Sequence, residues 1–436
     1  KAILAIAKAS GADAIHPGYG FLSENAAFAE ACAKAGIQFI GPAPECIRAM
    51  GDKISARALA EKAGVPMPPV SPTAIAYKEA ARALAHKIGY PLMVKASAGG
   101  GGKGMRLVNG PDELDEGLER ARSESESAFG DGRVFLERYF PEVHHIEVQV
   151  FGDTHGNYIH LFERECSIQR RHQKVIEETP SPTITQAERE AVCAAAVELA
   201  RACGYTGAGT VEFLYAEGQH YFLEMNTRLQ VEHPITELVT GLDLVRLQLT
   251  VAQGEPLGIR QEDLRQEGHA IESRICAEDP ITFMAAPGRI QNVAEPSGPG
   301  IRLDSFIHPG MDIPPFYDPL LAKLVVWAPD RPQAVQRMKR ALDEYVITGT
   351  KTNIPLHRHL LTHPEFLAGN TSTRFIETHC PNGPGEIPQD LEEALLAAIS
   401  IAHYENQTTT KTAAANRPAA PDSKWKSFGR FERLHG

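Results

Sequence analysis

The clearest alternation of hydrophobic and polar positions lies in residues 207–226, where two β-prone runs flank a glycine-containing turn. This pattern predicts a β-hairpin with its loop at residues 217–219. A three-residue loop would place Glu212 opposite Glu224, whereas a loop of two or four residues would put these side chains on opposite faces. Facing carboxylates repel each other, and a divalent cation between them would remove the repulsion. We therefore predict a magnesium site at this hairpin.

Polar residues continue to alternate beyond the second strand of the hairpin. Asn226 shares a face with Glu224, because side chains alternate along a strand. Three more polar residues follow on that face as far as the extended backbone continues, namely Arg228, Gln230 and Glu232. A strand in a hydrophobic core would not carry polar groups at five alternate positions, so the pattern favours a binding site. The alternative is a solvated edge strand with a ladder of salt bridges.

Residues 1–50 alternate between helical and strand patterns, which predicts βαβ units with a parallel sheet. Helices are expected up to Gly11 and from Asn25 to Gly36. Tyr19 lies between two glycines at the expected carboxyl end of a strand, where α/β sheets commonly bind ligands, although a simple tight turn explains it equally well. The chain begins inside a helical pattern, so we expect the first part of this domain to be missing.

A second unit follows, with helices predicted at residues 77–88 and 111–128 and three strands around them. Four adjacent glycines at 99–102 lie between two of these strands, just after Lys95. Their N–H groups could close over phosphates, and the alternative is a glycine hairpin without function. Lys53 is expected in the first turn of the preceding helix, where a cation is unfavourable. That position suggests an anionic partner, although on its own Lys53 is better explained as a surface lysine.

From residue 144 the pattern changes to antiparallel strands. The dense cation cluster at 169–174 (QRRHQK) favours an anion-binding loop, with a solvated loop as the alternative. Helices are predicted at 185–203 and at 236–253, one on each side of the hairpin.

Residues 255–375 form a third region of short strands with proline and glycine turns. Arg302 alternates there with apolar neighbours, which by itself indicates an arginine in a satisfied ion pair. Helices are predicted at 332–344, 353–361 and 389–402. The polar tail that follows is typical of a flexible linker.

Composition narrows the class of protein. The chain has 436 residues, of which 43% are hydrophobic and 23% charged, as expected for a globular protein of two or three domains. A formal net charge of −11 argues against a general nucleic-acid binder. The 7 cysteines are scattered without a CxxC pair, which indicates reduced thiols in a cytosolic-type compartment. We recognise no signal peptide, and the alanine-rich run at 191–203 is too short to span a bilayer.

Six segments, in this order, together closely resemble the biotin carboxylase family, the ATP-grasp component of the biotin-dependent carboxylases. They are residues 16–25 (HPGYGFLSEN), 40–53 (IGP…MGDK), 95–105 (KASAGGGGKGM), 163–178 (ERECSIQRRHQKVIEE), 207–213 (GAGTVEF) and 224–237 (EMNTRLQVEHPITE). The resemblance covers roughly residues 1–375. It implies a multidomain α/β and α+β fold of the ATP-grasp type. The expected domains are a truncated parallel α/β domain (1–67), a lid (68–139), the ATP-grasp core (140–254), a carboxyl-terminal antiparallel β domain (255–383), and a helix with a flexible tail (384–436).

The resemblance also implies a reaction. Bicarbonate and ATP would form carboxyphosphate, with Mg²⁺ or Mn²⁺ as cofactor, and biotin on a carrier protein would be carboxylated. Expected partners are a carboxyltransferase subunit, the biotin carboxyl carrier and a second copy of the chain, but neither nucleic acid nor a membrane. The expected location is the cytoplasm, or the mitochondrial matrix in a eukaryote. The acyl acceptor, of the acetyl-CoA, propionyl-CoA, methylcrotonyl-CoA or pyruvate type, is left open.

The same resemblance assigns site residues. The implied ATP-binding residues are Lys53, Lys95, Gly101, Gly102, Glu137, Phe140, His145, Gln169, His172, Glu212 and Glu224. The implied metal ligands are Glu212, Glu224 and Asn226. The implied bicarbonate pocket consists of Lys174, Arg228, Gln230, Val231 and Glu232, with Glu232 as the base. The implied biotin residues are Tyr19 and Arg302, and Lys174, Arg228, Glu232 and Arg302 are the implied catalytic residues.

Two other functions stay open at this point. The chain could be a nucleotide-binding subunit without turnover, because the opening strand–helix units of the family are absent. Ala98 replaces a glycine that is common in the family's loop, which is a mild change. The chain could also be another ATP-grasp ligase that needs an amine acceptor, although the segments at 169–174 and 224–234 speak against that alternative.

Overall fold

The computed structural model describes residues 1–436 except 72–73, 76, 97–104, 130–131, 386–398 and 402–436. Residues Lys1–Pro384 form one compact unit. Most of the helix predicted at 389–402, and all of the tail after it, lie outside the described residues.

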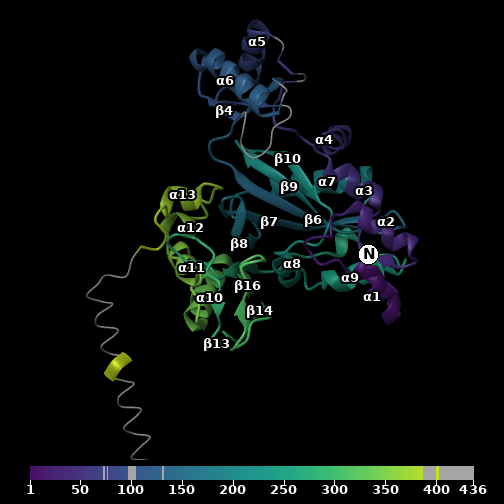
Figure 1. Cartoon of the computed structure of the whole chain (residues 1–436), viewed down its shortest axis with the longest axis vertical. Coiled ribbons are helices and arrows are strands. Elements are labelled where there is room, and N and C mark those ends of the chain that lie inside the picture. The colour runs from purple at the N-terminus through teal and green to yellow at the C-terminus, as the bar shows by residue number, and fades with distance from the viewer. Residues whose placement is uncertain (72–73, 76, 97–104, 130–131, 386–398, 402–436) are drawn as a thin grey trace, which may run out of the picture. The chain divides into compact units, whose positions relative to one another are not determined.

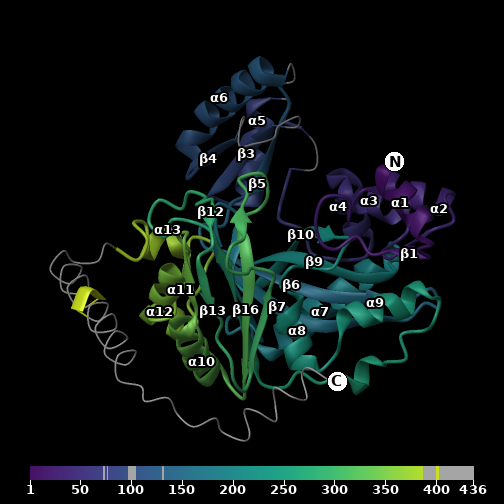
Figure 2. The same cartoon turned by 60° about the horizontal axis from the view of Figure 1, so that its bottom comes forward.

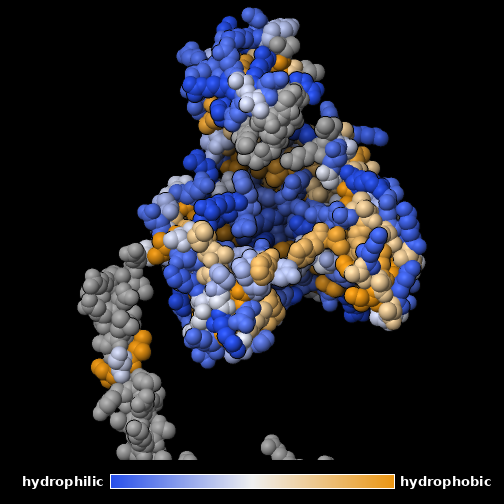
Figure 3. Space-filling model, viewed as in Figure 1, coloured by the Kyte–Doolittle hydropathy of each residue, from blue (hydrophilic) through white to orange (hydrophobic). Residues whose placement is uncertain are grey.

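The amino-terminal segment forms the predicted βαβ arrangement (Figures 1 and 2). Its elements are α1 (Ala2–Ser10), β1 (Ala14–Ile15), α2 (Ala26–Lys34), β2 (Gln38–Phe39), α3 (Pro44–Gly51) and α4 (Lys53–Lys62). The two short strands are parallel, as predicted. Gly11 ends α1 in the left-handed conformation, and the Asn25 side chain caps α2 by accepting from the Phe28 N–H. Ile3 and Ile6 on α1 are exposed, and a hydrophobic patch over this helix is visible in Figure 3.

A small antiparallel sheet follows, with the strand order β4-β3-β5 and with two helices packed on it. Its elements are α5 (Lys78–Ile88), β3 (Leu92–Ala96), β4 (Met105–Val108), α6 (Pro111–Phe129) and β5 (Val134–Arg138). Buried aliphatic side chains from both helices and all three strands form its core. The predicted helices and strands of this unit are confirmed, but the glycine run at 99–102 lies outside the described residues.

The largest sheet has eight antiparallel strands in the order β10-β9-β6-β7-β8-β11-β16-β14. Their bounds are β6 (His144–Gly152), β7 (Tyr158–Arg170), β8 (Gln173–Thr179), β9 (Gly207–Ala216), β10 (Gln219–Asn226), β11 (His269–Cys276), β14 (Ile301–Ser305) and β16 (Leu320–Ala328). The helices that pack on it include α7 (Gln186–Ala202), α8 (His233–Thr240), α9 (Leu244–Ala252) and α10 (Arg331–Glu344). The remaining elements are η1 (Gln261–Asp263), β12 (Gly288–Arg289), β13 (Asn292–Ala294), β15 (Asp312–Ile313), β17 (Val346–Thr348), α11 (Ile354–Leu360), α12 (Pro364–Ala368) and α13 (Phe375–His379). None of the described helices has the length and apolar character needed to cross a membrane.

The β9–β10 hairpin has the predicted pairing but not the predicted loop. Glu217 and Gly218 form a two-residue loop, both with positive φ. Such a loop alone would separate the two glutamates, yet the register shifts after Phe222 and sets Glu224 directly opposite Glu212. A bulge of one extra residue on β10 accounts for this. The predicted loop length was therefore wrong, whereas the facing pair is confirmed.

The single helix predicted at 236–253 is wrong. Gly241 ends α8 in the left-handed conformation, and the Asp243 side chain then caps α9 by accepting from the Arg246 N–H. The hydrophobic period continues through the break, which is why the pattern alone indicated one helix.

The buried Glu178 carboxylate joins β8 to β11 and α10. His269 Nε2 lies 2.8 Å from Glu178 Oε2, and Arg331 donates from Nε at 2.7 Å and from Nη2 at 3.0 Å. Burial alone would raise the pKa of Glu178, but the hydrogen bonds and charges of His269 and Arg331 lower it to about 2.

We expect Glu178→Gln to lower the free energy of unfolding near neutral pH by about 3 kcal/mol, because it leaves Arg331 without its counter-charge. The pKa of the folded state is below that of the unfolded state, about 4.3. The stabilisation is therefore complete above the unfolded value and is lost as the pH falls toward about 2. Urea unfolding at a series of pH values would test this. The gap between the two proteins should narrow in acid, and a constant gap would contradict the assignment. Glu198→Gln, in an exposed ion pair with Arg201, is the control and should change little.

Candidate functional site

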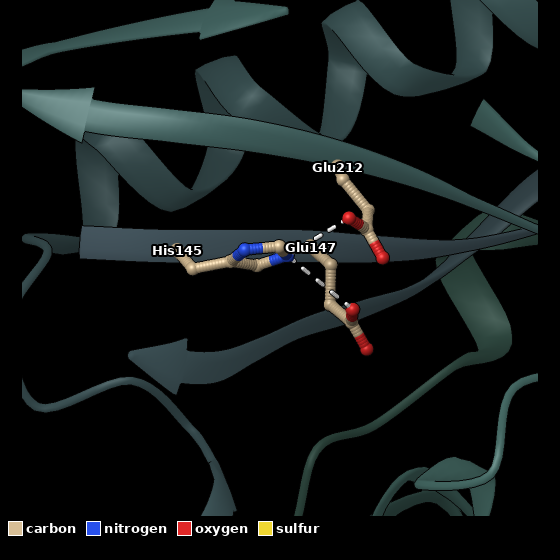
Figure 4. Close-up of side chains that lie close together, drawn as sticks. All are labelled: His145, Glu147 and Glu212. Atoms are coloured by element: carbon tan, nitrogen blue, oxygen red, sulfur yellow. Dashed lines mark ion pairs between the residues drawn. The ribbon is translucent and has the colours of Figure 1, made fainter. Parts of the chain in front are cut away.

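Buried polar side chains converge where β6 and β9 lie side by side in the large sheet. His145 and Glu147 alternate on β6 and therefore share a face, and Glu212 reaches them from β9 (Figure 4). His145 Nε2 lies 3.1 Å from Glu212 Oε2 and 3.8 Å from Glu147 Oε2. The ligand-type atoms of these three residues all lie within 4.8 Å of one another. The surface over the middle of this sheet is hollowed and mostly hydrophilic (Figure 3).

Lys174, on β8, is the cation that holds this cluster together. Its Nζ donates to Glu212 Oε1 at 2.9 Å and to Glu232 Oε1 at 2.7 Å, and it also donates to Glu147. Burial alone would lower the pKa of Lys174, but the attraction of the three carboxylates raises it well above its ordinary value. Burial would likewise raise the pKa of Glu212, which Lys174 and His145 lower instead. Lys174 is therefore charged and Glu212 is ionised at neutral pH.

Two arginines add positive charge next to the carboxylates that Lys174 contacts. Arg164 is fully buried and donates to Glu147 Oε1 at 2.5 Å, with further bonds to Gln149, Thr236 and Thr210. Arg274, on β11, donates from Nη2 to Glu232 Oε2 at 2.9 Å.

Glu232 therefore lies between two cations, because Lys174 holds one of its oxygens and Arg274 the other. Burial would raise the pKa of Glu232, but Lys174, Arg274 and Arg164 lower it well below the ordinary value. The carboxylate can accept a proton more readily once an anionic ligand draws one of these cations away.

The loop after β10 brings together the polar residues that the alternation singled out, although not along one strand. The strand ends at Asn226, so the shared strand face, which was expected only as far as the extended backbone continues, stops before Arg228. The side chains converge instead through the loop. Arg228 donates to Gln230 Oε1 at 2.8 Å and to Asn226 Oδ1 at 3.2 Å, while Gln230 and Asn226 donate to Glu212 Oε1 at 3.2 and 2.9 Å.

The hairpin carries a donor set that fits a hard divalent cation. Glu224 faces Glu212 across the β9–β10 pair, and the Asn226 amide is hydrogen-bonded to Glu212. Carboxylate and amide oxygens are the ligands that Mg²⁺ and Mn²⁺ prefer. The residues present therefore fit the predicted ion.

The amino-terminal segment contacts this loop directly. Glu24 accepts from the Thr227 N–H at 2.8 Å and from Arg228 Nε at 3.0 Å. Lys323 Nζ donates to the Val231 carbonyl at 3.0 Å and lies 5.7 Å from the centre of the Tyr19 ring. Tyr19, which is 40% exposed, thus lies near the loop that carries the predicted bicarbonate residues.

Arg302 makes the ion pairs that its alternation with apolar residues predicted. It donates to Glu237 Oε2 at 2.6 Å and to the two Asp304 oxygens at 2.9 and 3.0 Å. Among the described contacts, the arginine on Glu232 is Arg274, not Arg302. A biotin role for Arg302 stays a prediction.

The remaining predicted ATP residues lie on several elements. Lys95 Nζ is 2.6 Å from Glu137 Oε1 within the small sheet, and Phe140 stacks on Tyr221 with ring centroids 5.1 Å apart. Gln169 Nε2 donates to the Cys166 carbonyl at 2.8 Å, and His172 adopts positive φ in the turn between β7 and β8. Lys53 is the first residue of α4, but its side chain is not described, and Gly101 and Gly102 lie outside the described residues.

Sequence reasoning missed Glu147, Arg164, Arg274 and Lys323. The available signal was charge inside strands that are otherwise apolar, because such residues are rarely buried without partners.

Three family models match the chain. Residues 1–47 match the amino-terminal domain of biotin carboxylase, residues 52–260 match the ATP-binding domain of the carbamoyl-phosphate synthase L chain, and residues 272–378 match the carboxyl-terminal domain of biotin carboxylase.

Curated relatives and solved structures agree with these matches. A biotin carboxylase of Nostoc sp. is 53% identical over 377 residues, which covers 86% of this chain and 84% of that protein. A pyruvate carboxylase subunit of Methanothermobacter thermautotrophicus is 52% identical over 378 residues, which covers 86% of this chain and 77% of that protein. The crystal structure of the biotin carboxylase domain dimer of Hydrogenobacter thermophilus 2-oxoglutarate carboxylase, in complex with MgADP, ADP and bicarbonate, has a TM-score of 0.78 at 46% identity. That match covers 89% of this chain and 86% of the solved chain.

Proposed function

The chain belongs to the biotin carboxylase family, and from that premise we propose how its residues carry out the ATP-dependent carboxylation of biotin with bicarbonate. The observation that carries this proposal is the contact of Lys174 with Glu147, Glu212 and Glu232, next to Arg228 and Arg274. A buried cation and a loop rich in hydrogen-bond donors can bind an anion, and a carboxylate beside them can accept its proton.

Bicarbonate binds at the loop after β10. Lys174, Arg228 and Gln230 supply the donors and Val231 its backbone, while Glu232 accepts the bicarbonate proton. As bicarbonate draws Lys174 toward itself, the pKa of Glu232 rises from its low resting value and the carboxylate becomes a more effective base.

ATP binds along the small sheet and β6–β9. We assign its contacts to Lys53, Lys95, Gly101, Gly102, Glu137, Phe140, His145, Gln169, His172, Glu212 and Glu224. Glu212, Glu224 and Asn226 would hold Mg²⁺ or Mn²⁺, which when bound neutralises phosphate charge. The domain bounds expected from the sequence, with residues 68–139 as a lid, belong to this proposal.

With bicarbonate and ATP bound next to each other, carboxyphosphate forms first and biotin is carboxylated second. The deprotonated bicarbonate oxygen attacks the γ-phosphorus, the bond to the ADP oxygen breaks, and carboxyphosphate forms. Carboxyphosphate breaks down to CO₂ and phosphate, and the biotin nitrogen attacks the CO₂ after losing its proton to phosphate or its surroundings. Tyr19 borders the biotin ring. Because Arg274 rather than Arg302 contacts Glu232, we add Arg274 as a candidate beside Arg302 for stabilising the biotin enolate.

The proposal also covers the partner proteins of the chain and its compartment in the cell. The chain acts on biotin carried by a carrier protein or domain and works with a carboxyltransferase and with a second copy of itself. Relatives named for pyruvate and 2-oxoglutarate carboxylases leave the acyl acceptor open. All 7 cysteines are free thiols, which suits the reducing cytoplasm, or the mitochondrial matrix in a eukaryote.

A biotin-stimulated assay tests this function. Bicarbonate-dependent ADP release should rise when free biotin is added. Arg228→Ala should lower biotin carboxylation by at least about 100-fold, because it removes a bicarbonate donor, while calorimetric ATP affinity stays within about two-fold of wild type. Arg246→Ala, at an exposed position of α9, is the control.

Other outcomes separate the alternatives. ATP binding without turnover in the wild-type protein would select an inactive nucleotide-binding subunit. ADP release that requires an amine would select another ATP-grasp ligase. Loss of ATP binding in Arg228→Ala would point to misfolding.

A further inference from the structure

A pair of carboxyl groups is buried next to the arginine that contacts Glu232. Glu177 on β8 and Glu272 on β11 are directly opposite each other in the antiparallel pair, so their side chains leave the sheet on the same face. Both residues have 0% exposure. Glu177 Oε1 accepts from Arg274 Nε at 2.6 Å. Among the described residues, Glu177 Oε2 and both Glu272 oxygens have no hydrogen-bond partner.

Nearby cations cannot neutralise both carboxylates. Arg274 is shared between Glu177 and Glu232. Lys323, from β16, already donates to the Val231 carbonyl and lies 3.4 Å from Asp304. A buried carboxylate without a counter-charge is costly, and the group takes up a proton instead.

The charges around Glu272 favour its protonated form. Burial and then the negative charge of Glu177 raise the pKa of Glu272 well above its ordinary value, and Arg274 and Lys323 oppose this only in part. Burial raises the pKa of Glu177 to about 7, against the attraction of Arg274. Glu232 adds further negative charge to both groups.

The helix that covers this part of the sheet does not supply another cation. Burial, followed by the repulsion of Lys323, lowers the pKa of His233 in α8 to about 3, so that imidazole is neutral. Glu237, also in α8, pairs with Arg302. Because Arg274 favours the charged form of Glu177, the proton belongs to Glu272.

We propose that Glu272 is a positioning residue, a buried neutral acid whose proton is donated to Glu177 and thereby holds Arg274 against Glu232. The inference rests on the proposed role of Glu232 as the base for bicarbonate. With the proton in place, Glu177 presents one negative charge to Arg274, and the guanidinium can bridge Glu177 and Glu232. Without the proton, two facing charges draw Arg274 toward Glu177 and away from Glu232.

The protonation state can be measured directly by infrared spectroscopy of the whole protein. Wild-type protein near neutral pH should show the carbonyl stretch of a buried carboxylic acid, and Glu272→Gln should remove it. Glu198→Gln, in an exposed pair on α7, should leave the band unchanged. A wild-type spectrum without a band that depends on Glu272 would overturn the proposal, whatever the activity.

The positioning role has a separate kinetic test. Glu272→Leu keeps a similar volume but has no donor, and it should lower bicarbonate-dependent kcat by about 10-fold, within the range of lost positioning, with an unchanged KM for ATP. Glu272→Gln can donate an N–H to Glu177 and should restore most of that loss. The decline of wild-type activity in alkali, as Glu272 loses its proton, should be absent in Glu272→Gln. Equal pH profiles would contradict the positioning role. Absence of biotin-stimulated turnover in the wild type would instead reject the proposed function and leave the spectroscopic result standing.

Discussion

Lys174→Met should lower the free energy of unfolding by about 3–5 kcal/mol and abolish bicarbonate-dependent ADP release. The three carboxylates on Lys174 are buried, and removing their shared cation leaves charges that solvent cannot reach. Urea unfolding followed by circular dichroism would give the change in stability, and the ADP assay would give the change in turnover.

Two further variants make the Lys174 result specific. Lys62→Met removes an exposed lysine on α4 and should alter stability by no more than about 0.5 kcal/mol. Adding Glu212→Gln to Lys174→Met removes one uncompensated charge and should recover part of the lost stability, because Lys174 is the lysine or arginine that the described contacts place on Glu212, whereas Glu147 keeps Arg164. If Lys174→Met unfolded at the same urea concentration as the wild type, the stability of the cluster would not depend on this cation.

Glu232→Gln should lower bicarbonate-dependent turnover by about 10²–10⁴-fold, the size of a general-base contribution. The amide keeps the shape of the side chain but cannot accept the bicarbonate proton. ATP affinity, measured by calorimetry, should change by less than about three-fold, because the contacts shown for Glu232 are Lys174 and Arg274 rather than the small sheet.

The matched control is Glu255→Gln, at an exposed position after α9, which should leave turnover unchanged. If Glu232→Gln kept more than about a tenth of wild-type turnover, a base role worth 10²-fold or more would be excluded.

Local sequence signals were sufficient for most elements of the fold. Asn25, Asp52 and Thr185 cap helices near the expected positions. Alternation identified both strands of the hairpin. The signals failed where a single residue changes the path of the chain, as in the bulge after Phe222 and the helix break at Gly241.

The site was predictable only in part, because its charges come from strands that are distant in sequence. The run from Glu224 to Glu232 and the cation cluster at 169–174 marked two segments, and the resemblance assigned Lys174 its role. Arg274 could not be placed, since nothing local shows that β11 pairs with β8 and brings its arginine to Glu232. For Arg302, in contrast, the local pattern was sufficient, because it predicted the ion pairs that the structure contains.

The central claim is that bicarbonate held beside Lys174 and Glu232 attacks the terminal phosphate of ATP. Turnover with bicarbonate labelled with a heavy oxygen isotope tests this most directly, with the released phosphate analysed by mass spectrometry. The attack transfers one bicarbonate oxygen to phosphate in each turnover, so labelled phosphate should accumulate in step with ADP, and in Glu232→Gln its rate of formation should fall by the same factor as turnover, about 10²–10⁴-fold. Phosphate that carries no label while ADP accumulates would contradict the account.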